Sequence, residues 1–338
     1  MFKKTLVAAA LATATMGASA VQVAESETTS LEVYGNVAIS IYASDADGDT
    51  GWALENESRV GFRGHKDLSD NLTSFFQIEG NNVYNGAGKD NKDSNGQLGQ
   101  RDTFVGLKGD WGKVRIGRML TPMYEIVDWP FSSTSMGGVF DWNSDIGAFH
   151  RDRQSDQIQY SLPTMGTFNA AFTTGRGETN AKHEDNYFYG AGASVRVADM
   201  VTFRGAVEAE SARGAGAASE GSDTFGAIFA AEVTLPAGFA VKSAVKYGSV
   251  EDVATGDDNS QVFASFVGEY WSGPYGLRLN YVTAFEPSEN GEGLSDVGYG
   301  AQGMYVLGGA VFYARLHTTE MNEADGDITA RVGIEYGF

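Results

Sequence analysis

Apolar and polar side chains alternate with a two-residue period through much of this chain. No apolar stretch after residue 20 reaches the roughly 18 residues that a membrane-spanning helix needs. In residues 31–41 the apolar set shares one face of an extended strand: Leu31, Val33, Val37, Ile39 and Ile41. The same alternation recurs in residues 224–235, 239–247 and 328–338. The pattern predicts an all-β protein whose strands each have one apolar and one polar side.

Short turn motifs and longer segments, most of them rich in Asp, Asn, Gly and Ser, alternate strictly between the predicted strands. The short turns are residues 67–71, 109–112, 163–166, 198–200, 236–238, 272–276 and 308–309. The longer segments are residues 45–57, 85–99, 119–150, 175–186, 214–222, 249–260, 286–296 and 321–327. Fifteen connections join sixteen strands. Short turns at one end and long loops at the other are typical of outer-membrane barrels, so we predict a transmembrane antiparallel β-barrel of 16 strands.

Two other all-β architectures compete with the barrel. A β-propeller would show a repeated blade motif, and the chain has none. A soluble sandwich or lectin gives no reason for long and short loops to alternate. Aromatic residues near the predicted strand ends also favour the barrel, because aromatic girdles mark the membrane interfaces: Phe62, Tyr160, Phe168, Phe203, Tyr281, Phe285, Tyr336 and Phe338.

Residues 1–20 differ from the rest of the chain. Lys3 and Lys4 precede an apolar run, which ends in the Ala-Ser-Ala pattern of residues 18–20. These features predict a secretory signal peptide over residues 1–20 and a barrel over residues 21–338. A buried N-terminal helix is the alternative.

Composition excludes several kinds of site. The chain has no Cys, so it holds no disulfide and no thiolate zinc site. Acidic residues outnumber basic ones by 44 to 24, for a net charge of -20, which argues against a nucleic-acid partner. The four histidines are scattered without metal-ligand spacing, and we predict neither a metal site nor a cofactor.

The third long segment, residues 119–150, is too apolar for an ordinary solvated loop. Its aromatic residues include Trp129, Phe131, Phe140, Trp142 and Phe149. Since the inner wall is the nearest large surface in a barrel, we predict that this segment folds inward and narrows the lumen. An external lid or a contact between protomers is the alternative.

Several short motifs together resemble the general diffusion porins of Gram-negative outer membranes. They are residues 31–35 (LEVYG), 58–64 (SRVGFRG), 101–108 (RDTFVGLK), 117–118 followed by 124–125 and 137–138, and 153–160. The terminal Phe338 is similar to the assembly signal of that family. The resemblance implies a 16-stranded barrel, usually a homotrimer, in contact with outer-membrane lipid and lipopolysaccharide, whose third loop forms an eyelet.

The same resemblance implies that arginines on the wall face carboxylates on the inward loop. By their positions in the matching motifs, the wall arginines are Arg59, Arg101 and Arg153. Where relatives carry a basic residue in the first strand this chain has Asn36, so the cluster is weaker by one charge. A salt bridge that stiffens the wall is the other interpretation of each arginine.

The loop carboxylates follow the family pattern less closely. The expected acid falls near Ser135 and Met136, neither of which is acidic, so we predict Glu125, Asp128 and Asp141 instead. Further inward cations are expected from their offset to apolar neighbours: Arg63, Arg115, Arg204, Lys242, Lys246 and Arg278.

These features predict a passive outer-membrane channel for small hydrophilic solutes and ions, and not an enzyme. Opposed charges across a narrow aqueous gap would create a transverse field that selects solutes by size and charge. A substrate-specific channel, an adhesin or structural barrel, and a barrel enzyme with a nucleophile near the rim are the alternatives.

Overall fold

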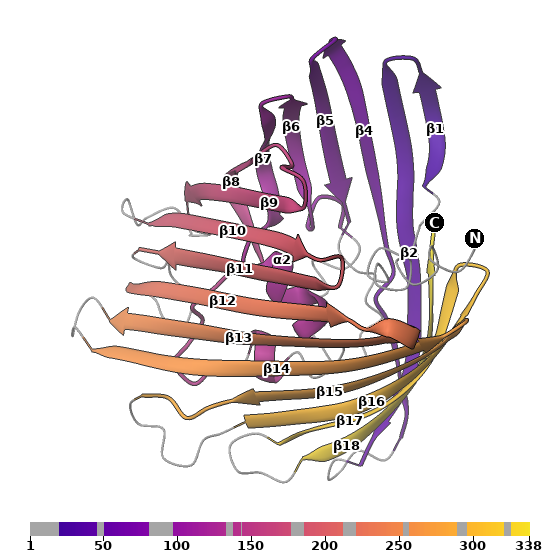
Figure 1. Ribbon diagram of the computed structural model, residues 1–338, viewed down its shortest axis with the longest axis vertical. Helices are drawn as coiled ribbons and strands as arrows, with labels where there is room; N and C mark the ends of the chain where they lie inside the picture. Colours follow the sequence, from indigo (N-terminus) through magenta and orange to yellow (C-terminus); the bar gives the residue numbers. More distant parts are fainter. Residues whose placement is uncertain are drawn as a thin grey trace.

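The computed structural model shows the strands arranged as a ring (Figure 1). It describes residues 20–45, 51–80, 97–132, 138–142, 144–176, 186–211, 221–252, 257–288, 296–320 and 326–338. The predicted signal peptide, except for residue 20, lies outside these residues. So do most residues of several long loops.

The described residues form these strands: β1 (Val21–Ser26), β2 (Thr29–Ser44), β3 (Ala53–Asn56), β4 (Arg59–Ser69), β5 (Leu72–Glu79), β6 (Thr103–Gly109), β7 (Gly112–Leu120), β8 (Arg153–Ser161), β9 (Phe168–Arg176), β10 (Tyr187–Val197), β11 (Val201–Glu210), β12 (Ser222–Thr234), β13 (Phe239–Asp252), β14 (Asp258–Ser272), β15 (Tyr275–Ala284), β16 (Asp296–Leu307), β17 (Ala310–Glu320) and β18 (Asp327–Gly337). The helical turns are α2 (Tyr124–Ile126), η2 (Val127–Ser132), η3 (Gly138–Trp142) and η4 (Pro236–Gly238). No helix among the described residues is long and apolar enough to cross a membrane.

The sheet closes on itself through β2. One half of β2 pairs with β4 from Thr29 to Asn36, and the other half pairs with β18 from Asn36 to Ser44. All the other wall strands pair antiparallel with their neighbours in the chain, so the predicted 16-stranded antiparallel barrel is confirmed.

Two short strands were not predicted, and both pair with β2 at this seam. β1 pairs with the start of β2, and β3, which lies in the first long segment, pairs with residues 39–42 of β2. They use backbone edges of β2 that β18 and β4 leave open.

All the predicted short turns are confirmed, because each joins two consecutive wall strands. In the β16–β17 turn, Gly308 and Gly309 have φ angles of 56° and 89°, a left-handed conformation that glycine adopts without strain. The turns therefore all lie at one end of the barrel, which we call the short-turn end. In outer-membrane barrels this end faces the periplasm.

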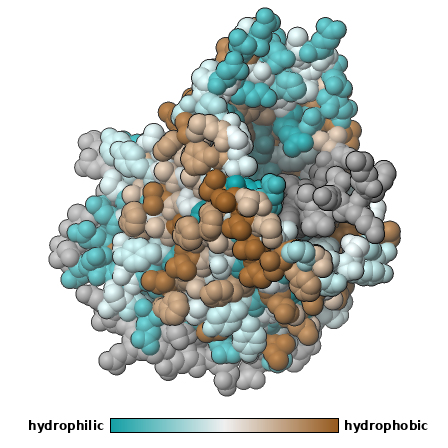
Figure 2. Space-filling model, in the orientation of Figure 1, coloured by the Kyte–Doolittle hydropathy of each residue, from teal (hydrophilic) through white to brown (hydrophobic). Residues whose placement is uncertain are grey.

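The two sides of each strand have opposite polarity. Apolar side chains that face outward are strongly exposed, as at Phe229 (59%) and Leu279 (54%). Inward side chains of the wall include charged residues with almost no exposure, such as Lys246 (0%) and Arg278 (2%). Figure 2 shows apolar residues gathered across the front of the barrel and hydrophilic residues over the projecting strands β1, β2, β4 and β5. The outer surface fits the hydrocarbon of a membrane, and the inner surface is polar.

The described part of residues 121–150 packs against inward-facing side chains of the wall. The aromatic side chains of Phe131, Phe140 and Phe149 are fully or almost fully buried. They share one apolar cluster with wall residues of β11 to β15: Ala206, Ile228, Ala230, Ala244, Val250, Phe263, Val282 and Ala284. Figure 1 shows α2 within the ring of strands. Contact with the inner wall thus accounts for the apolar side chains that the structure describes here, whereas the side chains of Trp129 and Trp142 lie outside the described ones.

Glycines on the inner wall make room for the segment. A Cβ atom on Gly248 of β13 would lie 2.4 Å from the ring of Phe149, and one on Gly226 of β12 would lie 3.0 Å from Met123. Any other residue at Gly248 would push Phe149 away from the wall. The position of the loop therefore depends on small residues of strands that are distant in the sequence.

Candidate functional site: the charged constriction

The three predicted wall arginines lie near one another around two carboxylates. Arg101 Nε donates to Glu79 Oε1 at 2.5 Å, and Arg59 Nε lies 3.9 Å from the same oxygen. Arg153 Nε donates to Asp102 Oδ1 at 2.7 Å. These contacts join β4, the two residues that precede β6, and β8 on one side of the lumen. The three cations therefore form one cluster, which is partly neutralised by Glu79 and Asp102.

Sequence reasoning did not identify Glu79 and Asp102. Glu79 is 8% exposed and also accepts a hydrogen bond from the Tyr34 hydroxyl at 2.9 Å. Asp102 follows Arg101 directly, and Glu79 is the last residue of β5. The ion pairs that Glu79 and Asp102 form with the arginines connect residues that are far apart in the chain. Only the pairing register of strands such as β4, β5 and β6 reveals these contacts.

Asp128 is the loop carboxylate on which all three arginines act. Its side chain is exposed, although the barrel wall surrounds it. Partial desolvation raises the pKa of Asp128 above its usual range, while the positive charges of Arg153, Arg101 and Arg59 oppose this rise. The arrangement places a loop carboxylate within the field of the wall cluster.

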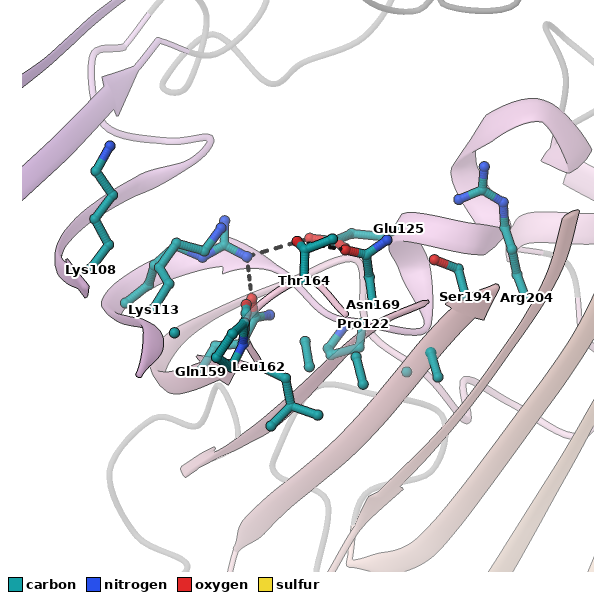
Figure 3. Close-up of a pocket in the computed structure, with 18 of the residues that line it drawn as sticks. Lys108, Lys113, Pro122, Glu125, Gln159, Leu162, Thr164, Asn169, Ser194 and Arg204 are labelled. Atoms are coloured by element: carbon teal, nitrogen blue, oxygen red, sulfur yellow. Dashed lines mark hydrogen bonds and ion pairs between the residues drawn. The ribbon is translucent and has the colours of Figure 1, made fainter. Parts of the chain in front are cut away.

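Glu125 lies closer to the short-turn end. Its carboxylate is 46% exposed and lies 3.5 Å from the guanidinium of Arg115 on β7. Arg115 also donates to Gln159 of β8, and its guanidinium lies 5.1 Å from the ring centre of Phe104. Figure 3 shows Glu125 at the edge of a cavity that several cations line. Glu125 therefore faces a cation other than the three predicted arginines.

Asp141 is turned away from the open lumen. Its side chain is 6% exposed, and its Oδ2 accepts a hydrogen bond from the Tyr124 hydroxyl at 2.8 Å. The backbone carbonyl oxygen of Asp141 lies 3.2 Å from Nζ of Lys246 and 3.0 Å from Nε2 of His150. Lys246 also lies 4.5 Å from the ring centre of Phe263. These contacts join residues 124–150 of the loop to β13 and β14.

The other expected inward cations belong to ion pairs along the wall. Lys242 and Arg278 both contact Glu269, at 2.9 Å and 2.5 Å, and Arg204 pairs with Glu232 at 2.6 Å. Near the strand seam, Arg331 pairs with Glu55. Burying such charges is costly unless they are paired, so these contacts let a charged wall remain folded.

The position that departs from the family pattern also has a polar partner. Asn36 donates to Glu335 of β18 at 3.1 Å and so connects the two strands that close the barrel. Ser135 and Met136, where the family's loop acid was expected, lie outside the described residues.

Comparison with known proteins shows the same architecture. The profile of the family described as "Gram-negative porin" matches residues 7–337. A curated relative named Chitoporin, from Vibrio furnissii, is 37% identical and covers 100% of this chain and 99% of its own.

Solved structures have the same fold. The anion-selective porin from Comamonas acidovorans superposes with a TM-score of 0.74 at 18% identity, covering 92% of this chain and 100% of its own. OmpT of Vibrio cholerae in its trimer form gives a TM-score of 0.65 at 13% identity, with the same coverage.

Proposed function

We propose that this chain, which belongs to the Gram-negative porin family and forms a diffusion channel in the outer membrane, selects small hydrophilic solutes and ions at a constriction charged on both sides. The observation that carries the proposal is the cluster of Arg59, Arg101 and Arg153 around Glu79 and Asp102 on the wall, together with the exposed carboxylate of Asp128 on the loop. Passage is diffusive, and we expect no catalysis.

The proposed mechanism is electrostatic. The cation cluster on the wall and Asp128 on the loop would set up a field across the lumen, in a gap where the protein walls limit screening by water. Dipolar water and polar solutes align with such a field, so a nonpolar solute gains less on entering. Glu125 with Arg115 would extend the field toward the short-turn end. Asp141 instead would hold the loop in place.

We infer that three barrels associate as a homotrimer. The support is the relative OmpT, whose structure is described as a trimer form. The outward apolar side chains would then contact partner barrels on one side and lipid and lipopolysaccharide elsewhere. Chemical cross-linking of the detergent-folded protein tests this, since a ladder that ends at three chains is expected.

A second candidate function is selective passage of sugars. The relative named Chitoporin supports it, and so do aromatic rings on the inward side of β2, β6 and β17: Tyr34, Tyr42, Phe104 and Tyr313. Each ring lies within 5.1 Å of a guanidinium. Sugars stack on such faces. Saturable block of the ion current by a chitin fragment, absent with a nonstacking polyol, would favour this function over nonselective diffusion.

The main experiment measures single-channel conductance and reversal potential in a planar bilayer under a KCl gradient. Asp128→Asn should lower the cation-to-anion permeability ratio by about two- to threefold, the effect of a change in potential of order kT. Arg101→Gln should raise the ratio by a similar factor. Closure of the channel current in three equal steps would support the trimer.

Two outward-facing variants are the matched controls. Asp156 of β8 and Arg176 of β9 are exposed and lie opposite each other on the outer face. Asp156→Asn and Arg176→Gln change the same charges outside the lumen and should leave the permeability ratio unchanged. If the lumen and control variants behave alike, the proposed constriction is wrong.

A further inference from the structure

A cavity of about 560 Å³ lies between the inward loop and the wall at the short-turn end. Its floor includes Pro122, Glu125 and Ile126 of the loop, and its walls come from β6 to β11. Four cationic side chains line it, and Glu125 is the one carboxylate among the lining residues that the structure describes: the cations are Lys108, Lys113, Arg115 and Arg204. The cavity is therefore strongly basic within an acidic protein.

The two lysines among these cations repel each other when no anion is bound. Lys108 of β6 and Lys113 of β7 are directly opposite in the sheet register. Like charges in such a pair destabilise a sheet. Arg115 lies two residues further along β7, on the same side of the strand. With Lys108 and Lys113, Arg115 also lines a neighbouring cavity of about 450 Å³. Lys108, Lys113 and Arg115 thus lie between the two cavities and line both of them.

The carboxylates nearby offset only part of this charge. Glu125 contacts Arg115, and Arg204 contacts Glu232, whereas both lysines face the cavity. In Figure 3, Lys108 and Lys113 lie on one side of the cavity and Arg204 on the other, with Asn169 and Ser194 between them. An anion between the two sides would interact with cations on both.

Neutral hydrogen-bonding groups complete the lining. They are Gln159, Ser161, Thr164, Asn169 and Ser194, next to small residues that leave room for a ligand: Gly112, Ala170, Ala171, Gly192 and Ala193. A group of hydroxyls and amides next to lysines suits a ligand with both a strong anion and several hydroxyls. The volume lies within the 300–1,000 Å³ range of small-molecule sites.

We propose that this cavity binds the phosphate group of a phosphorylated sugar on the short-turn side of the constriction. Lys108 and Lys113 contact the phosphate, which carries about -1.5 to -2 charges at pH 7. Asn169, Ser194 and Thr164 bind the sugar hydroxyls. The site is distinct from the arginine cluster around Glu79 and Asp102, and it does not depend on the selectivity proposed for that cluster.

Titration calorimetry of the detergent-folded barrel tests the site with glucose 6-phosphate, inorganic phosphate and glucose. Glucose 6-phosphate should bind more tightly than inorganic phosphate, and glucose should not bind measurably. The double variant Lys108→Gln, Lys113→Gln should weaken binding of glucose 6-phosphate about tenfold or more, because each lost contact is a charged hydrogen bond. Lys66→Gln is the matched control, since Lys66 is an exposed lysine of β4 that lines neither cavity.

Calorimetry needs no ion flow, so its result is independent of whether the constriction sets selectivity. Absence of binding to the folded wild-type barrel would falsify the proposal, as would equal affinity in the double variant. Equal affinity for inorganic phosphate and glucose 6-phosphate would overturn the assignment to a sugar phosphate. Circular dichroism and heat-dependent electrophoretic mobility establish that each variant is folded.

Discussion

Carboxylates of one loop have different surroundings and therefore different roles. Asp128 is exposed and within the field of three arginines, whereas Asp141 is buried and accepts a hydrogen bond from Tyr124. Glu125 contacts a fourth arginine, Arg115. The same chemical group is thus exposed in one position and buried in the packing of the loop in another.

The pH dependence of loop packing follows from Asp141. Burial raises the pKa of Asp141, and the positive charge of Lys246 opposes the rise; Tyr124, Asp128 and Asp152 also act on it. The protonated form is therefore favoured in the folded state. Its stabilising contribution is complete below the ordinary aspartate pKa and is lost as the pH rises through the raised value.

Hydrogen exchange of residues 138–150 measures this effect. Protection factors, corrected for intrinsic exchange, should fall between pH 5 and pH 8 in the wild type. Asp141→Asn keeps an acceptor for Tyr124 but does not ionise, so its protection should not change with pH. The same decline in the variant would show that another group is responsible.

Among the elements, the position of the loop depends on complementary shapes of the loop and the strands. Phe149 occupies space that Gly248 leaves open, and the backbone carbonyl of Phe131 accepts a hydrogen bond from Ser265 of β14 at 2.8 Å. Strands β12 to β15 thus hold a loop that lies between β7 and β8 in the sequence.

Gly248→Ala tests this packing. The added methyl group would lie 2.4 Å from the Phe149 ring, so the ring must move, at a cost of about 1–3 kcal/mol in the free energy of unfolding. We expect a lower thermal midpoint and a noisier single-channel current. The matched control is Gly268→Ala in β14, where the added atom has no neighbour within 4 Å and neither quantity should change. Equal effects of the two substitutions would contradict the packing argument.

In the whole molecule, closure of the barrel brings the last residue of the chain against β2, the first strand of the wall. Gly35 N donates to the Phe338 carbonyl at 2.8 Å, and Phe338 N donates to the Gly35 carbonyl at 3.0 Å. A Cβ atom on Gly35 would lie 2.8 Å from the Phe338 ring. The last residue thus packs on the strand that closes the ring.

Phe338→Ala should weaken this closure. Loss of the ring removes apolar contacts worth about 1–2 kcal/mol, while the backbone bonds to Gly35 remain. We expect a lower yield of folded barrel in detergent and a lower unfolding temperature. Phe338→Tyr keeps the ring and should restore both. If alanine and tyrosine fold equally well, the ring does not contribute to closure.

Much of the fold was predictable because the rules behind it are local. A two-residue period follows from the pleat of a strand, so Val37, Ile41 and Val332 could be assigned to the outer face without a structure. Turn residues such as Gly308 and Gly309 are selected by local backbone conformation. The strands β1 and β3 were missed because both are short and lie where the alternation gives no clear boundary.

Without a structure one can infer the strand order, the turns, the polarity of the two faces and the candidacy of Arg59, Arg101 and Arg153, since each depends on neighbouring residues or on a short motif. Other features emerge only from the folded barrel: Glu79 and Asp102 pair with those arginines, Asp141 is buried, and Lys108, Lys113 and Arg204 line one cavity. These relations join strands and a loop that are distant in the chain, and their distances are set by the register and closure of the barrel.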